Sequence, residues 1–325
     1  MKDTTRMTCF QFGSSMPDLT YDVRAAPLVQ IFSVSLFTEF DNEIPCEIYS
    51  SIRASDGQGI GLDLYDRDLN DCETTIKDGT LSLTGPEGYP ILGSKGVTID
   101  VDLKDKIRGI ELIRGRHYLD SMREDSYDKL TKAVFQGRHG SVHLYYTTFQ
   151  FAIAAIVEVA IVPKGEGSGG FDDVYGSITA YYKDDKQFCR SDDEVKHLKT
   201  SLFEKPSDKS VRVMMGTPLK LLRSLVAVPA YSSLIIEAEL FGSRCQFSSS
   251  PVVFPIVDSG YFIASIPSED GCVELKIKVN RRNVYPQVYG EIKPNTKHTE
   301  SKTEEPPKKA KVNLFFGVIL IFLLH

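Results

Sequence analysis

The spacing of apolar residues between about residues 28 and 280 constrains the fold of this chain more than any other feature. Apolar residues recur at every second position in short runs such as VTIDVDL (97–103) and VELKIKV (273–279), and glycine, proline, aspartate and serine separate the runs. Successive side chains of a strand point to opposite faces, so each run has one apolar and one polar face. The pattern predicts an all-β chain of antiparallel sheets.

Two segments depart from this short alternation. The longest apolar run, Phe151–Val162, is long enough for a helix, but its β-branched content and its end at Pro163 favour a buried strand. Residues 121–135 (SMREDSYDKLTKAVF) have charged residues at helical spacing and a poor apolar stripe. They are expected to form an exposed excursion with helical turns.

Four pairs of strand-like segments resemble each other in the same order along the chain. They are IYSSIRA (48–54) with VYGSITA (174–180), LYDR (64–67) with LFEK (202–205), VTIDVDL (97–103) with LIIEAEL (234–240), and GSVHLYY (140–146) with GCVELKI (271–277). A repeat of about 130 residues with seven or eight short strands suits a β-sandwich. We therefore predict two tandem antiparallel β-sandwich units. The alternative is chance similarity between short strands.

The predicted organisation has five parts. They are a polar leader (1–27), a first sandwich (28–150), a second sandwich (151–280), a disordered charged linker (281–311) and a short hydrophobic tail (312–325). The leader has no apolar segment of the kind found in secretory signals, which favours a cytoplasmic or nuclear protein.

Composition excludes some function classes. The net charge is −6, which disfavours a protein that binds nucleic acid through its phosphates. No two of the six cysteines form a CxxC pair, and their spacing is irregular. We therefore expect free or buried thiols, and we expect neither a zinc site nor a disulfide framework. The sequence has no GxSxG nucleophile motif. No cofactor and no catalytic residue is predicted.

An ordered set of motifs resembles a large family of grass proteins known only as a domain of unknown function. In this sequence the motifs are FSVSL (32–36), IRASD (52–56), LYDRDLNDCET (64–74), LSLTGP (81–86), VTIDVDL (97–103), VYGSITA (174–180) and PLKLLRSLVAVPAYSSLIIEAEL (218–240). The resemblance covers about residues 28–280. Two departures are Ser50-Ser51, where the family has a glycine context, and Phe241-Gly242-Ser243, where acidic residues are common.

The resemblance brings no established activity. Some relatives resemble fusions to cereal ribosome-inactivating domains, which implies a link to stress or defence. That activity depends on a Glu-Ala-x-Arg stretch and a tryptophan, whereas residues 237–240 read Glu-Ala-Glu-Leu and the chain has no tryptophan. A weaker likeness to C2 sandwiches suggests a C2-like fold. The positions around Asp100 and Asp102 offer too few oxygen ligands beside too many lysines for calcium.

Three motifs match binding sites only in part. Asp66, Asp68 and Asn70 match the start of an EF-hand loop, but Asp71 and Lys77 occupy positions that require glycine and glutamate, so a solvated turn is predicted.

Gly165, Gly167 and Gly170 spell GxGxxG, but a strand-like segment follows where a dinucleotide site needs a helix, so a connector is predicted. His139 and His143 lie four residues apart without an identifiable third ligand, so no metal is expected.

The C-terminal segment leaves alternatives open. Lys308, Lys309 and Lys311 resemble a nuclear-import signal, a membrane-proximal basic cluster or a plain linker. Leu314–Leu324 is an apolar run of eleven residues, and as a helix it spans roughly 16 Å, about half of a bilayer core. It fits weak membrane contact or an unusual gene-model end.

The favoured function is a non-catalytic intracellular module that binds an unknown protein partner through surface loops on a rigid sheet scaffold. One alternative is an enzyme, either a hydrolase or a ribosome-directed N-glycosidase by family association. The other is a membrane-surface adaptor held by the C-terminal tail.

Overall fold

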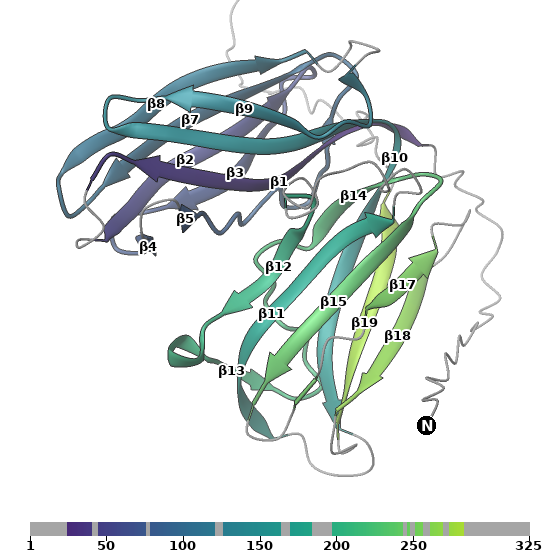
Figure 1. The fold of residues 1–325 in the computed structure, drawn as a ribbon. Coiled ribbons are helices and arrows are strands. Elements are labelled where there is room, and N and C mark those ends of the chain that lie inside the picture. The colour runs from purple at the N-terminus through teal and green to yellow at the C-terminus, as the bar shows by residue number, and fades with distance from the viewer. Residues whose placement is uncertain are drawn as a thin grey trace, which may run out of the picture. The chain divides into compact units, whose positions relative to one another are not determined.

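A computed structural model describes residues 25–40, 45–75, 79–120, 126–163, 170–183, 197–242, 246–247, 251–255, 261–268 and 273–282. The chain divides into two compact units, residues 1–286 and 287–325, and every described residue lies in the first. The described part consists mainly of antiparallel strands, and the 3-10 turn Ser207–Lys209 is a short helical element within it. The all-β prediction is confirmed (Figure 1).

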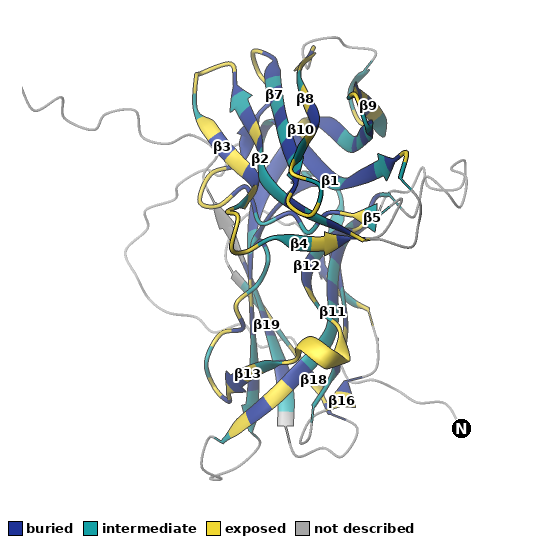
Figure 2. Ribbon diagram, turned by 90° about the vertical axis from the view of Figure 1, so that its left-hand side faces the viewer, coloured by how far each residue is buried: buried dark blue, intermediate teal, exposed yellow. Residues whose placement is uncertain are grey.

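The first sandwich packs two sheets face to face. One sheet contains β1 (Ala26–Thr38), β5 (Gly79–Thr80), β6 (Ile91–Leu92), β9 (Thr131–Gln136) and the first half of β10 (Gly140–Pro163). The other contains β2 (Cys46–Asp56), β3 (Gly61–Arg67), β4 (Glu73–Thr75), β7 (Val97–Asp105) and β8 (Ile110–Leu119). Along β7, inward residues such as Val101 are buried while alternate residues are partly exposed, and Figure 2 shows this alternation. Side chains from both sheets form one core.

The second sandwich continues from the second half of β10. That half pairs with β14 (Leu225–Pro229) and β19 (Val273–Arg282), and β18 (Tyr261–Pro267) pairs with β19. The facing sheet contains β11 (Phe171–Lys183), β12 (Thr200–Lys205), β13 (Val211–Met214), β15 (Ser233–Phe241), β16 (Gln246–Phe247) and β17 (Val252–Pro255). A second core lies between these sheets.

Strand β10 belongs to both sandwiches. Its first half pairs with β1 and β9, and its second half pairs with β14 and β19, so one eight-stranded sheet runs through the two sandwiches (Figure 1). The predicted boundary between residues 150 and 151 lies inside this strand. The run Phe151–Val162 is a strand, as its β-branched residues predicted.

The expectation of helical turns in 121–135 is wrong for its second half. Residues from Thr131 onward form β9, in which Ala133 and Phe135 are buried and alternate with exposed residues. The charges at helical spacing are outweighed by this period-two burial, because β9 pairs with β10 and contributes to the first core. Residues 121–125 lie outside the described part.

The pairing registers match the internal repeat. Strand β2 lies between β3 and β7, and β11 lies between β12 and β15. Ile52 lies opposite Val101, and Ile178 lies opposite Ala238, as the aligned sequence segments require. In both copies the pairing with the edge strand has a register shift directly after this isoleucine. A shared irregularity at the same position is difficult to attribute to chance.

The remaining strands correspond in the same way. Strand β4 pairs with β2 as β13 pairs with β11, and β6 pairs with β1 as β14 pairs with the second half of β10. Strand β9 pairs with the first half of β10 as β18 pairs with β19. The counterpart of β8 is divided into β16 and β17, both paired with β15.

A buried arginine links the two sandwiches. Arg223 lies just before β14 and is 3% exposed. Its guanidinium donates hydrogen bonds to the main-chain oxygens of Ile31 (2.7 Å), Phe32 (2.6 Å) and Ser201 (3.3 Å). Strand β1 has a register shift between Ile31 and Ser33, so its carbonyls there leave the regular ladder. Arg223 therefore supplies hydrogen-bond donors to these carbonyls in place of the main-chain N–H groups of a regular ladder.

Candidate functional site: the outer faces of the repeated sheets

The outer face of the first repeat carries a ladder of opposite charges. This charged face consists of Arg53, Asp63, Asp100, Asp102, Arg114 and Arg116. Arg116 Nε lies 2.5 Å from Asp100 Oδ1, and Arg114 Nη2 lies 3.2 Å from Asp102 Oδ2. These residues lie opposite each other on β7 and β8, where cross-strand pairs of opposite charge stabilise a sheet.

A shallow hollow of about 450 Å³ opens on the charged face. Ser51, Val101 and Gly115 line it together with the two cross-strand ion pairs. The arginine side chains of these pairs are 62% and 73% exposed, so solvent screens their ion pairs strongly. Asp102 Oδ1 is buried and has no hydrogen-bond partner among the described residues.

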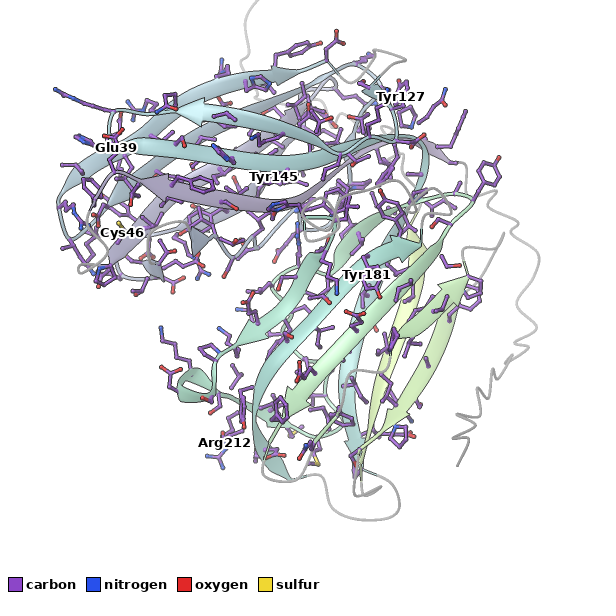
Figure 3. The ribbon with its side chains drawn as sticks, in the orientation of Figure 1. Glu39, Cys46, Tyr127, Tyr145, Tyr181 and Arg212 are labelled. Carbon is purple, nitrogen blue, oxygen red and sulfur yellow. The ribbon has the colours of Figure 1, made fainter. Side chains whose placement is uncertain are left out.

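The corresponding face of the second repeat is aromatic. This tyrosine face consists of Tyr175, Tyr181, Lys199, Ile235, Glu237 and Phe241, contributed by β11, β15 and the residue before β12. The rings of Tyr175 and Phe241 stack with centroids 5.4 Å apart. Tyr181, labelled in Figure 3, lies opposite Ile235 across the β11–β15 pair.

A polar network fixes the orientation of Tyr181. Its hydroxyl donates a hydrogen bond to Glu237 Oε1 (2.7 Å), while Lys199 Nζ donates to Glu237 Oε2 (2.7 Å) and lies 5.0 Å from the Tyr181 ring centroid. Burial and the adjacent carboxylate raise the pKa of Tyr181. Burial alone would raise the pKa of Glu237, but the hydrogen bonds from Lys199 and Tyr181 outweigh it and lower the pKa.

This network predicts a pH dependence. Because the pKa of Glu237 is lower in the folded chain than its ordinary value of 4.5, its stabilising effect is complete above that value and is lost as the pH falls. Replacing Glu237 by glutamine is expected to reduce the free energy of unfolding at pH 7, and the difference from wild type is expected to shrink below about pH 4.5. Urea unfolding at several pH values measures this. An unchanging difference would contradict the assignment.

Some outward positions have diverged between the repeats, although Asp100 and Asp102 correspond to the acidic Glu237 and Glu239, and inward positions have kept their apolar character. Residues aligned by register show that Thr98 and Lys104 of the first repeat correspond to Ile235 and Phe241 of the tyrosine face. Inward positions such as Leu103 and Leu240 are fully buried in both copies. The two copies therefore present different surfaces on the same scaffold.

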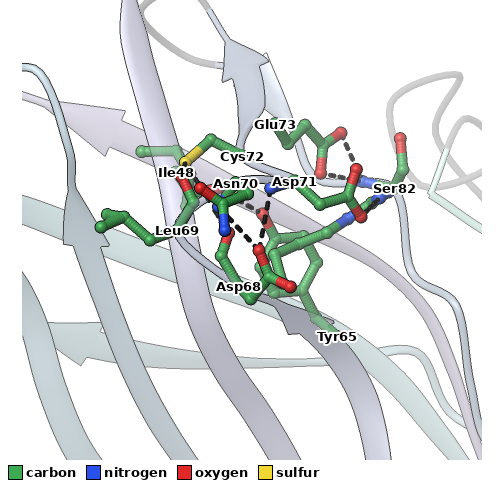
Figure 4. Close-up of polar contacts among 10 residues, drawn as sticks. Ile48, Tyr65, Asp68, Leu69, Asn70, Asp71, Cys72, Glu73 and Ser82 are labelled. Carbon is green, nitrogen blue, oxygen red and sulfur yellow. Dashed lines mark hydrogen bonds and ion pairs between the residues drawn. The ribbon is translucent and has the colours of Figure 1, made fainter.

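The EF-hand-like segment is a turn, as predicted. Asp68 Oδ1 accepts hydrogen bonds from the main-chain N–H groups of Asn70 (2.6 Å) and Asp71 (3.0 Å), and Asp71 pairs with Arg67 at 2.7 Å (Figure 4). These oxygens bind the turn itself and do not converge on a common point for a cation.

The other sequence motifs are not brought together. His139 stacks on Phe40, whereas the ring of His143 packs 4.3 Å from that of Phe37 and its Nε2 lies 3.4 Å from Ser141 Oγ. Burial, with a smaller effect from Lys132, lowers the pKa of His143. Across the ranges that the structure describes, no group of three or more histidine, cysteine, aspartate or glutamate residues is placed to hold a metal ion.

The glycine motif behaves as a connector at its described end. Gly170 is followed directly by strand β11, so the helix that a dinucleotide site requires does not follow it. Gly165 and Gly167 lie outside the described residues. Cys46 and Cys72 are free thiols, and the other four cysteines lie outside the described residues.

The C-terminal predictions also fall outside the described part. These are the basic cluster Lys308, Lys309 and Lys311 and the apolar run Leu314–Leu324. The described residues form no helix with the length and hydropathy needed to cross a membrane.

Sequence reasoning missed the tyrosine face and Arg223. The tyrosine face unites residues that are 38 and 56 positions apart in the chain, and period-two spacing does not reveal such neighbours. Arg223 could have been identified from the sequence as a buried charge, because it is the single charged residue in the apolar stretch LLRSLVAV (221–228).

Two kinds of solved structure resemble the chain distantly. Human GIVD cytosolic phospholipase A2 aligns with a TM-score of 0.27 and 9% identity over 80% of this chain and 31% of its own. The pair of C2 domains of Extended-Synaptotagmin 2 aligns with a TM-score of 0.23 and 10% identity over 86% of this chain and 98% of its own. The match thus spans about a third of the phospholipase. No curated protein matches the sequence.

A family model covers most of the strands described above. It matches residues 28–279, a range that contains both repeats from β1 into β19. The chain therefore belongs to the family described as Domain of unknown function (DUF6598).

Proposed function

We propose that this chain is a non-catalytic binding module that recognises a protein partner through the tyrosine face. The observation that carries the proposal is the divergence of the repeated sheets. At matching outward positions, the cross-strand pair Ser55 and Thr98 of the first repeat is replaced by Tyr181 and Ile235 in the second. Lys104 is likewise replaced by Phe241, which stacks on Tyr175. Tyrosine is enriched at protein interfaces because it combines apolar area with a polar group.

The tyrosine face is well ordered for binding. Glu237 is bound on both oxygens, by Tyr181 and Lys199, so these side chains have already lost much of their rotational freedom before a partner arrives. Binding through such side chains loses less conformational entropy. Val253, which is 40% exposed and lies opposite Ile235, extends the apolar area. We expect a partner surface with apolar side chains and a hydrogen-bonding group.

We also propose that the interaction takes place in the cytoplasm or nucleus. The free thiols of Cys46 and Cys72 support this, because those compartments keep cysteines reduced. No cofactor, metal or nucleic acid is part of the proposed interaction.

Comparative capture tests the proposal. The full-length chain and a Tyr175→Ala/Tyr181→Ala variant are used as baits in extract from the source organism, and bound proteins are quantified by mass spectrometry. We expect at least one partner to fall by about tenfold or more, since truncating a tyrosine that is a binding hot spot costs about 2 kcal/mol or more. The matched control, Arg114→Ala/Arg116→Ala on the charged face, is expected to retain that partner.

Two results would overturn the proposal. One is that the two variants, both shown to be folded by thermal unfolding, lose every partner to the same extent or lose no partner at all. The other is turnover by the purified full-length chain in hydrolase or ribosome N-glycosidase assays without any stable partner. That outcome would favour the enzyme alternative.

A further inference from the structure

The edge strand β18 is open to pairing. It lies at the end of the eight-stranded sheet and pairs with β19 on one side (Figure 1). No strand in the described ranges pairs with its other side. The main-chain N–H and C=O groups along an open edge form a template for another strand.

Strand β18 lacks the charges that protect the other edges. Among the described edge strands of six residues or more, the charged residues are Asp63, Asp66 and Arg67 in β3, Glu111, Arg114 and Arg116 in β8, Lys132 in β9, and Glu204 and Lys205 in β12. Strand β18 reads YFIASIP and has none. Natural proteins place charges on edge strands to prevent edge-to-edge pairing, so this strand permits it.

The internal repeat shows what β18 has lost. Its counterpart β9 packs against β8, and the ring of Phe135 in β9 lies 5.8 Å from that of His117 in β8. In the second repeat the ten-residue strand β8 is replaced by β16, of two residues, and β17, of four. Within the described residues, the first repeat therefore packs a long strand beside this edge, and the second has two short strands in its place.

The surroundings of β18 favour a second copy of the same chain. Ile263 is 49% exposed and lies opposite Lys278, whose charge is neutralised by Glu158 at 3.1 Å. Lys276, opposite Ser265, lies 3.3 Å from Glu274. An uncharged strand beside neutralised pairs does not repel an identical strand.

We propose that two copies of this chain associate through β18, with the two strands antiparallel about a two-fold axis. Such an interface is self-complementary, and each strand supplies the hydrogen-bonding edge that the other lacks. Ile263 and Ser265 point to the same face of the strand, so each copy places both residues beside those of its partner near the axis. The resulting sheet continues from one protomer into the other.

Sedimentation velocity of the full-length chain over a concentration series tests the proposal. We expect a reversible monomer–dimer equilibrium in the wild type. An Ile263→Glu/Ser265→Glu variant is expected to raise the dimer Kd by about 100-fold, because it places four carboxylates side by side at the interface. The control Val134→Glu changes a similarly exposed residue on β9, 46% exposed, and is expected to leave the Kd unchanged.

Hydrogen exchange distinguishes a second copy from other occupants of the edge. We expect the main-chain amides of 261–267 to become more protected as protein concentration rises. A monomer at every concentration would overturn the proposal. Constantly high protection of 261–267 in that monomer would mean that another segment of the same chain covers the strand, and constantly low protection would mean that the edge stays unpaired. Dimers whose Kd is unaffected by the Ile263→Glu/Ser265→Glu variant would also overturn it.

Discussion

Replacing Arg223 by methionine is expected to lower the free energy of unfolding by about 3–5 kcal/mol, because three main-chain carbonyls lose the hydrogen bonds of its guanidinium. The carbonyls belong to Ile31, Phe32 and Ser201, and the guanidinium that reaches them is fully buried. The carbonyl of Ile31 keeps a hydrogen bond from Gln30 Nε2 at 3.2 Å, so the loss falls mainly on the other two. Methionine fills a similar volume, so most of the expected loss comes from unsatisfied carbonyls and little from a cavity.

Urea unfolding followed by circular dichroism measures this loss. Arg223→Lys keeps the positive charge but not the forked donors, so an intermediate loss is expected, and this variant remains informative if Arg223→Met does not fold. The control Arg114→Met alters a side chain that is 62% exposed and is expected to change stability by about 0.5 kcal/mol or less. Equal stability of Arg223→Met and wild type would show that the carbonyls are satisfied in another way.

The arginine is stable in this position for a specific reason. Burial lowers the pKa of Arg223 to about 9, which is still above neutral pH, so the guanidinium keeps its charge. The hydrogen bonds of this side chain go to main-chain oxygens, which carry partial negative charge and accept charge-assisted hydrogen bonds. Gln30 acts beside it, since its Oε1 accepts a hydrogen bond from Ala227 N at 2.8 Å. The junction between the sandwiches thus contains buried polar groups beside apolar contacts such as that of Phe149 with Tyr182.

The strands and the repeat were predictable because both depend on local spacing. Alternation in 97–103 identifies the two faces of β7, and matched segments such as 48–54 and 174–180 occupy the same place in their sheets. The sharing of β10 was not predictable in this way. It depends on which strands pair with each half of one long apolar run, and that is a long-range property.

The functional faces were less predictable than the fold. Alternation shows that Glu237 points away from the core, but not that Tyr181 and Lys199 lie beside it. Those contacts depend on the register of β11 against β15. Once the repeat is known, the register follows from the first copy, and comparing outward residues between copies becomes a way to find such a face.

The repeat also provides a test of backbone strain. Ser50 and Gly176 occupy matching positions, opposite Leu103 and Leu240, and both have positive φ angles, of 84° and 119°. Glycine adopts such angles without steric cost, whereas a residue with a Cβ is strained. The first copy therefore contains a strained residue where the second contains glycine.

Replacing Gly176 by serine is expected to lower the free energy of unfolding by about 3 kcal/mol or more, because strain and steric overlap add. A Cβ at this position would lie 2.1 Å from the carbonyl oxygen of Glu239 on the paired strand, so β11 and β15 would have to separate. The reverse change, Ser50→Gly, relieves strain but increases the entropy of the unfolded chain, and a gain of at most about 1 kcal/mol is expected.

Chemical unfolding of the two single variants measures both effects. Ser177→Ala is the matched control, since it alters the next residue, which is partly exposed, and is expected to change stability by about 0.5 kcal/mol or less. If Gly176→Ser lowers the free energy of unfolding and Ser50→Gly raises it, the two repeats share a backbone geometry that favours glycine. Only the second repeat has glycine at this position. A neutral Gly176→Ser variant would instead mean that β11 and β15 approach each other less closely than the 2.1 Å overlap requires.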